Sequence, residues 1–138
     1  MRECVRGMSL LELMIVVVII CVLAVMAYPN YRQYAARAKR NEAKAALLQI
    51  TTRQESFYLQ NNTFTTDMRA LGFPVSGNWI TDTGSYMINV GAADANDFTA
   101  TATYQKADAE AGKCATFRVD SRGTKTSAPL ADCWTRTR

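Results

Sequence analysis

The sequence predicts an α+β fold in which one long N-terminal helix packs against a small antiparallel β-sheet. An unbroken apolar run covers residues 8–27, and a polar, alanine-rich stretch follows it through Gln60. Beyond residue 84, short segments alternate apolar and polar side chains, as half-buried strands do. With 138 residues, the chain has the length of one domain.

The first part of the predicted helix, residues 8–28, is long and apolar enough to span a membrane. Its apolar run has twenty residues, MSLLELMIVVVIICVLAVMA. As a helix these residues extend over about 30 Å, the thickness of the hydrocarbon core of a bilayer. The run holds one charged residue, Glu12. A helix that is apolar on every side lies in lipid or inside a bundle of helices.

Residues 1–7 have the pattern of a leader peptide. Arg2 and Arg6 make this segment basic, and the small residue Gly7 precedes the apolar run. An ordinary secretory signal has its small-residue cleavage site after the apolar region. Glu12 is the fifth residue beyond Gly7. The sequence G-M-S-L-L-E resembles the class III leader of type IV prepilins and pseudopilins, commonly G-F-T-L-I-E, with Met8 in place of Phe.

This resemblance to type IV pilins implies roles for three residues. A prepilin peptidase and methylase would cleave the bond between Gly7 and Met8 and N-methylate Met8. Glu12 would act in subunit assembly, because the new α-ammonium of one subunit can neutralise this carboxylate on its neighbour in a packed bundle. From the residues alone, a simple anchor helix whose Glu12 reaches the membrane interface explains the sequence equally well.

Residues 29–60 are predicted to continue the helix as an amphipathic half. Pro29 removes a backbone hydrogen bond and is expected to kink the helix there, where pilins often carry a proline. Residues 31–60 contain no Gly or Pro, and a stripe of side chains three or four residues apart is expected to face the sheet. The stripe comprises Ala43, Leu47, Ile50, Gln54 and Phe57, and the opposite face is expected to carry Arg37, Arg40, Lys44 and Arg53.

Residues 61–138 are predicted to form a loop followed by the sheet. We expect residues 74–84 to be a loop in which Trp79 is a core or interface anchor. Alternating patterns predict strands at 85–90, 98–104 and 114–119, within an antiparallel meander of three or four strands. The residues around the helix end and the ending D-C-W resemble PilE-type minor pilins.

Cys114 and Cys133 are expected to form a disulfide. Free thiols and half of a metal site are the alternatives, but the chain has no His, and its other cysteines, Cys4 and Cys21, lie in the leader and the apolar run. A disulfide that closes a loop of about twenty residues contributes roughly 3 kcal/mol in the chain-entropy model. It requires an oxidising compartment. By the pilin resemblance, this loop is the C-terminal D-region.

Two signals conflict over the orientation in the membrane. Arg2 and Arg6 precede the apolar run, whereas Arg32, Arg37, Lys39 and Arg40 follow it and favour a cytoplasmic soluble part. The paired cysteines and the leader favour the periplasm. Because flank charge is a bias that longer domains can override, we predict a single-pass protein of the bacterial inner membrane with a periplasmic head, which becomes part of an extracellular pilus after assembly.

The sequence gives no sign of catalysis. The absence of His excludes Ser-His-Asp and Cys-His arrangements, and no nucleotide-binding glycine motif is present. We therefore expect no catalytic residues, no metal and no cofactor. The net charge is +4, and residues 113–138 carry six basic residues against two acidic ones. A nucleic-acid partner stays open, although no aromatic residues are interleaved with these charges.

The pilin resemblance implies a structural subunit of a type IV pilus, most like a minor pilin. Its expected partners are other pilin subunits, which it contacts through the N-terminal helix, and an inner-membrane assembly platform. Such filaments serve adhesion, twitching motility and DNA uptake. Two alternatives are a type II secretion pseudopilin, which commonly lacks the C-terminal disulfide, and a secreted or membrane-anchored binding module. In its secreted form, this module would be cleaved after residue 27 and begin at Tyr28.

Overall fold

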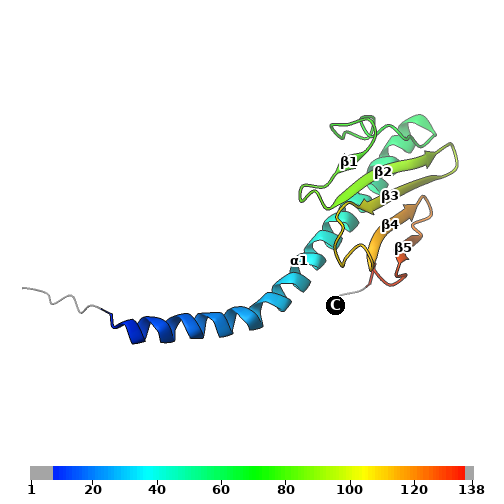
Figure 1. Cartoon of the computed structure of the whole chain (residues 1–138). Coiled ribbons are helices and arrows are strands. Elements are labelled where there is room, and N and C mark those ends of the chain that lie inside the picture. Colours follow the sequence, from blue (N-terminus) through cyan, green and yellow to red (C-terminus); the bar gives the residue numbers. More distant parts are fainter. Residues whose placement is uncertain (1–7, 136–138) are drawn as a thin grey trace, which may run out of the picture. The chain divides into compact units, whose positions relative to one another are not determined.

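The computed structural model of the chain describes residues 8–135. The chain divides into two compact units, Met1–Ala35 and Ala36–Arg138. The boundary falls inside the one long helix, and the second unit also holds a five-stranded sheet (Figure 1). The predicted α+β fold, a long N-terminal helix with an antiparallel sheet, is confirmed. The elements are α1 (Leu10–Asn61), β1 (Trp79–Ile80), β2 (Tyr86–Ala93), β3 (Phe98–Tyr104), β4 (Cys114–Asp120) and β5 (Lys125–Pro129).

The bounds of α1 agree closely with the predicted helix. It has 52 residues, and Pro29 lies inside it. The helix does not end at this proline, and the kink expected there stays a prediction. At its C-terminal end, Asn62 has a φ of 53°, a left-handed conformation that Asn tolerates. The Asn62 amide donates a hydrogen bond to the carbonyl of Tyr58 at 2.8 Å, so the helix ends with one of its last carbonyl groups satisfied.

The five strands are antiparallel and follow one another in sequence order, β1-β2-β3-β4-β5. Three of them lie where the alternating patterns predicted strands. The structure adds β5, and it corrects the predicted loop at residues 74–84, because Trp79 and Ile80 form β1 and pair with Ile88 and Met87. The Trp79 ring packs against Phe73, with 5.2 Å between the ring centroids.

The core lies between the inner face of the sheet and one stripe of α1. Burial alternates perfectly along β3, from Phe98 to Tyr104, which confirms the alternation in its sequence. Four members of the predicted helix stripe are buried, and Phe57 is packed against them in part. Other buried side chains of this core include Tyr86, Ile88, Val90, Phe117 and Val119 from the sheet, and Met68 and Leu71 from the loop after α1.

The prediction that Arg40 lies on the face of α1 opposite the apolar stripe is wrong. This side chain is only 4% exposed. Arg40 precedes Leu47 by seven residues, which is almost two full turns of helix, so both residues point to the same side. Lys44 and Arg53 are half-buried and contact other segments of the head, as described below. The cations therefore belong partly to the packed surface of the helix.

Two polar side chains of α1 hold the loop that follows it. The Gln54 amide is fully buried and bonds both the N–H and the carbonyl of Thr65, at 3.1 and 2.5 Å. Arg53 donates to the carbonyl of Leu71 at 2.6 Å and stacks over the Phe73 ring at 4.5 Å. The loop is thus fastened to the helix at two points before it enters β1.

We predict that Gly72→Ala destabilises the head. Gly72 has a φ of 81°, and an added Cβ would lie 2.8 Å from Nη1 of Arg53, the atom that bonds Leu71. Backbone strain of this kind costs about 1–3 kcal/mol. Urea unfolding of the full chain in neutral detergent micelles, followed by tryptophan fluorescence, measures the change in the free energy of unfolding.

Two further glycines are matched controls for this variant. Gly123 has a φ of 77° but nothing within 4 Å of its Cβ position, so Gly123→Ala measures strain alone. Gly77 has neither feature, and Gly77→Ala should change stability little. Equal stability of the Gly72 and Gly77 variants would contradict our account.

Candidate assembly helix and nucleic-acid interface

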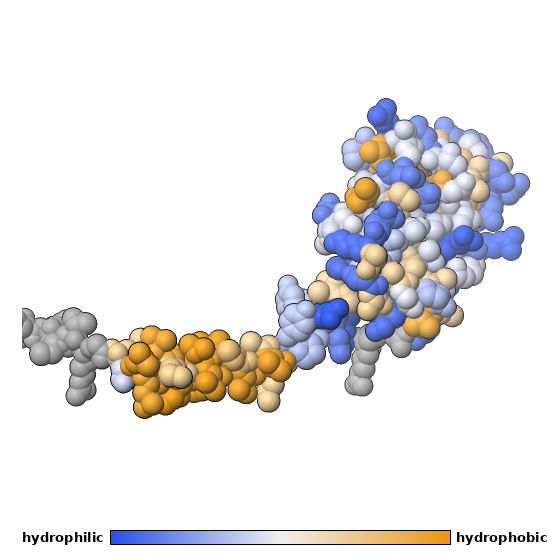
Figure 2. All heavy atoms as spheres, in the orientation of Figure 1, coloured by the Kyte–Doolittle hydropathy of each residue, from blue (hydrophilic) through white to orange (hydrophobic). Residues whose placement is uncertain are grey.

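In the first unit, the apolar side chains of α1 are exposed around the whole helix. Leu10 is 79% exposed and Val25 is 75% exposed, and the space-filling view shows this segment as an almost uniformly hydrophobic surface (Figure 2). By length and composition, α1 is able to cross a membrane. Since so large an apolar surface is unfavourable in water, it needs cover from lipid or from other helices.

The two described residues of the predicted processing and assembly site lie at the start of this helix. Met8 precedes α1 by two positions, and Glu12 lies in its first turn. Gly7, the other side of the predicted junction, lies outside the described residues. A carboxylate in the first turn is stabilised by the positive end of the helix dipole.

In the second unit, a buried ion pair fastens the loop between β3 and β4 to α1. The guanidinium of Arg40 bonds both carboxylate oxygens of Glu110, with Nη2 and Oε2 2.7 Å apart. The hydrogen bonds with Glu110 raise the pKa of Arg40 against the opposing effect of burial. A more exposed pair joins Lys39 and Asp108 at 3.8 Å beside it. This ion pair was not predicted, although the seven-residue spacing of Arg40 and Leu47 places both side chains on one side of the helix.

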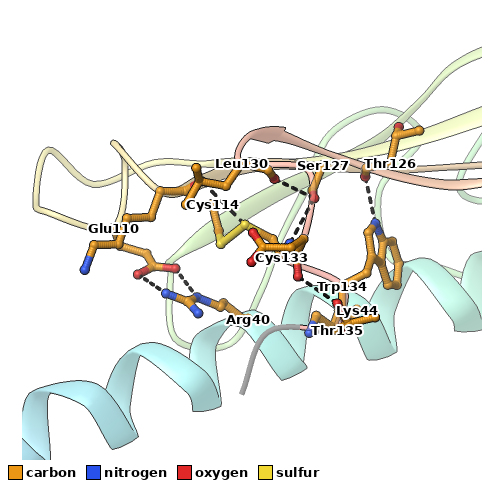
Figure 3. Close-up of a disulfide and its surroundings, with 12 residues drawn as sticks. Arg40, Lys44, Glu110, Cys114, Thr126, Ser127, Leu130, Cys133, Trp134 and Thr135 are labelled. Atoms are coloured by element: carbon orange, nitrogen blue, oxygen red, sulfur yellow. Dashed lines mark hydrogen bonds and ion pairs between the residues drawn. A yellow bond between two sulfur atoms is a disulfide. The ribbon is translucent and has the colours of Figure 1, made fainter. Parts of the chain in front are cut away.

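The Cys114–Cys133 disulfide joins the segment after β5 to the start of β4 (Figure 3). The Ser127 hydroxyl donates to the carbonyl of Leu130 at 2.8 Å and accepts from the Cys133 amide at 3.2 Å. Lys44 donates to the carbonyl of Trp134 at 2.9 Å. Burial lowers the pKa of the Lys44 ammonium, and the nearby Arg40 charge lowers it further. We call residues 130–135 the disulfide tail.

Trp134 of the disulfide tail covers the edge strand β5. Its indole N–H donates to the carbonyl of Thr126 at 2.7 Å, and its ring meets the Phe117 ring edge-on at 5.5 Å. The ammonium of Lys125 lies 5.6 Å from the centre of the Trp134 ring. An open edge strand is a template for unwanted pairing, so this contact occupies one of its free carbonyl groups. No local sequence pattern indicates these contacts, because they join residues from separate segments of the chain.

Four exposed cations lie on and around β4 and β5. Asp120, between them in sequence, is occupied by the turn after β4, where its carboxylate accepts from the amides of Arg122 and Thr124. We call the four cations the β4–β5 basic surface. Such a surface attracts polyanions. Its members are Lys113, Arg118, Arg122 and Lys125.

The described residues offer no arrangement for metal binding. Within residues 8–135, no group of three His, Cys, Asp or Glu side chains could hold a metal ion. The functional features that the structure does present are a helix that needs cover, a head with its loops fastened to that helix, and a basic surface on two strands.

Two comparisons with protein families place the chain. Residues 29–118 match the family described as type IV minor pilin ComP, DNA uptake sequence receptor. Residues 4–28 match the prokaryotic N-terminal methylation motif. No curated protein matches the chain. Because the first match covers more than half of the sequence, the chain belongs to the ComP family of type IV minor pilins.

Family membership establishes the general role of the chain. It is a structural subunit of a type IV pilus, anchored in the inner membrane through its apolar helix and later part of an extracellular filament. Assembly with other pilins and processing by prepilin peptidase follow from the family and the leader motif. The match does not favour the two alternatives, a secretion pseudopilin and a secreted module.

We predict that Glu110→Gln lowers the free energy of unfolding by about 3–5 kcal/mol, because it leaves the Arg40 charge buried without its partner. Asp108→Asn, which removes the charge of the neighbouring exposed pair, should change it by about 1 kcal/mol or less. Urea unfolding of the full chain in micelles measures both. If the two variants lose stability equally, the Arg40–Glu110 pair is not the fastening that we describe.

Proposed function

We propose that this minor pilin binds double-stranded DNA during uptake through its β4–β5 basic surface. The single observation that carries the proposal is the gathering of Lys113, Arg118, Arg122 and Lys125 in exposed positions on one hairpin and the turn before it. The family description, which names a DNA uptake sequence receptor, supports the same ligand.

Electrostatics explains why this surface suits DNA. Duplex DNA carries a dense row of phosphates, and each Lys or Arg that neutralises one releases a bound counterion. The acidic residues of the head lie mainly outside this surface, since residues 61–112 carry six acids against two basic residues. The β4–β5 basic surface therefore carries more positive than negative charge, which attracts an approaching polyanion.

We also propose how the subunit enters the filament. Cleavage between Gly7 and Met8 gives Met8 a free α-ammonium, which is then methylated by the same peptidase and methylase. Glu12 pairs with this terminus on a neighbouring subunit, since an isolated carboxylate in an apolar helix is unfavourable. An inner-membrane assembly platform delivers the subunit. The position of Glu12 in the first helical turn and the methylation-motif match support this proposal.

We predict salt-dependent binding of a fluorescent DNA duplex to the full chain in neutral micelles. Combining Arg122→Gln with Lys125→Gln removes two phosphate contacts. The slope of log affinity against log salt should therefore fall in magnitude by about 1.8, and affinity at 0.1 M salt should fall by about tenfold per contact. Fluorescence polarisation measures both quantities.

Lys106→Gln is the matched control for this binding experiment. Lys106 is an exposed cation outside the β4–β5 basic surface, where it donates to the carbonyl of Thr83. Its loss should leave the slope unchanged. A wild-type chain that does not bind DNA at low salt would refute the proposed ligand, and equal losses for both kinds of variant would refute the proposed surface.

We predict that the subunit in sheared pili has the mass of a chain that begins at methylated Met8. Glu12→Gln should lower its amount in pili by at least about tenfold, the equivalent of 1.4 kcal/mol, while the membrane pool persists. Asp82→Asn removes an exposed head carboxylate and should not alter incorporation. Mass spectrometry and quantitative blotting measure these outcomes. A chain that begins at residue 28 would contradict the assembly role.

A further inference from the structure

The outer face of the sheet carries a polar hollow over β3, β4 and β5. Its volume is about 260 Å³. This face is the one turned away from α1, so the hollow is separate from the core. Its lining residues are Thr101, Thr116, Arg118, Thr126, Ser127 and Ala128.

The strand register places the polar side chains of the hollow in adjacent rows. Thr101 of β3, Arg118 of β4 and Thr126 of β5 are cross-strand partners, which puts each about 4.8 Å from the next. Thr116 lies one row along β4, next to the register shift between Cys114 and Thr116. Such a bulge bends the strand and redirects side chains, which is how a sheet surface becomes concave.

The hollow contains hydrogen-bond donors and no acid. Among the described residues, no ion pair or hydrogen bond engages the Arg118 guanidinium or the hydroxyls of Thr101, Thr116 and Thr126. A guanidinium offers a planar fork of N–H groups that matches two oxygens of a phosphate. One fork with three hydroxyls around it is suited to a group that has several acceptor oxygens and a negative charge.

The disulfide tail holds the β5 wall of the hollow in place. The Ser127 hydroxyl bonds Leu130 and Cys133, and the Thr126 carbonyl accepts from the indole of Trp134 (Figure 3). Cys133 is in turn joined to Cys114 at the start of β4. The strand that supplies half of the lining is therefore fixed before any ligand arrives, and preorganisation of this kind favours binding.

We propose that this hollow is an oxyanion site that seats one phosphate group of the DNA backbone. The proposal rests on the proposed DNA binding and assigns Arg118 a role that differs from the other cations of the basic surface. The Arg118 guanidinium donates two parallel hydrogen bonds to a phosphate in the hollow. This contact fixes the position of the duplex along the head. Lys113, Arg122 and Lys125 act as exposed point charges. Inorganic phosphate has the same chemistry and serves as a probe.

The first experiment titrates inorganic phosphate into the isotope-labelled full chain in neutral micelles. We expect NMR shifts at Thr101, Thr116 and Thr126, and none at Thr99, which lies on the same face of β3 but outside the hollow. Arg118→Gln should abolish the shifts. Shifts that are absent, or that persist in the variant, would overturn the proposal. An unchanged unfolding midpoint shows that the variant is folded.

The second experiment measures duplex DNA binding by fluorescence polarisation. Arg118→Gln should weaken binding by about tenfold at 0.1 M salt, and Arg118→Lys should keep the salt slope but recover only part of the affinity, because lysine lacks the fork. Arg69→Gln, an exposed arginine remote in sequence from the hollow, is the control.

The two experiments distinguish the inference from the function on which it rests. If DNA binds the wild type and Arg118→Gln equally well, the phosphate seat is wrong and the DNA-binding function stands. If inorganic phosphate shifts the three threonines but no DNA binds, the hollow takes free phosphate, and both the DNA assignment and the proposed function are wrong.

Discussion

The contact between one stripe of α1 and the inner face of the sheet determines how the rest of the head is arranged. The stripe is apolar in its middle, where Ala43, Leu47 and Ile50 meet the sheet, and polar at its two ends. Arg40 at one end holds the loop between β3 and β4, and Gln54 at the other holds the loop before β1. A single helical repeat therefore organises the core and both major loops.

Burial of polar groups makes this arrangement specific. An apolar stripe alone would tolerate a small rotation or shift of the helix against the sheet. The buried Arg40 and Gln54 do not, because a shift would leave a charge and an amide without partners in a place that water does not reach. Hydrophobic burial drives the association of helix and sheet, and these two side chains select one register for it.

The elements predicted correctly from the sequence are those in which apolar residues recur at a regular spacing. The apolar run, the amphipathic helix and the strands that carry Tyr86, Phe98 and Phe117 all have alternation or helical spacing that a single segment reveals. β5 escaped prediction, since Lys125–Pro129 has no large apolar residue and is held by backbone pairing and the disulfide tail. The hollow could not be predicted from the sequence either. It depends on the cross-strand register and on a bulge, which bring together residues far apart in the chain.

Because the disulfide tail contacts β5, the moment at which the disulfide forms determines when β5 gains this support. Thiols stay reduced in the cytoplasm, so the Cys114–Cys133 bond forms only after the head has crossed the inner membrane. Until then, Trp134 and Ser127 lack the covalent anchor that keeps them on the edge strand. The edge strand β5 therefore gains its covalent support only outside the cytoplasm, after the subunit has been made and translocated.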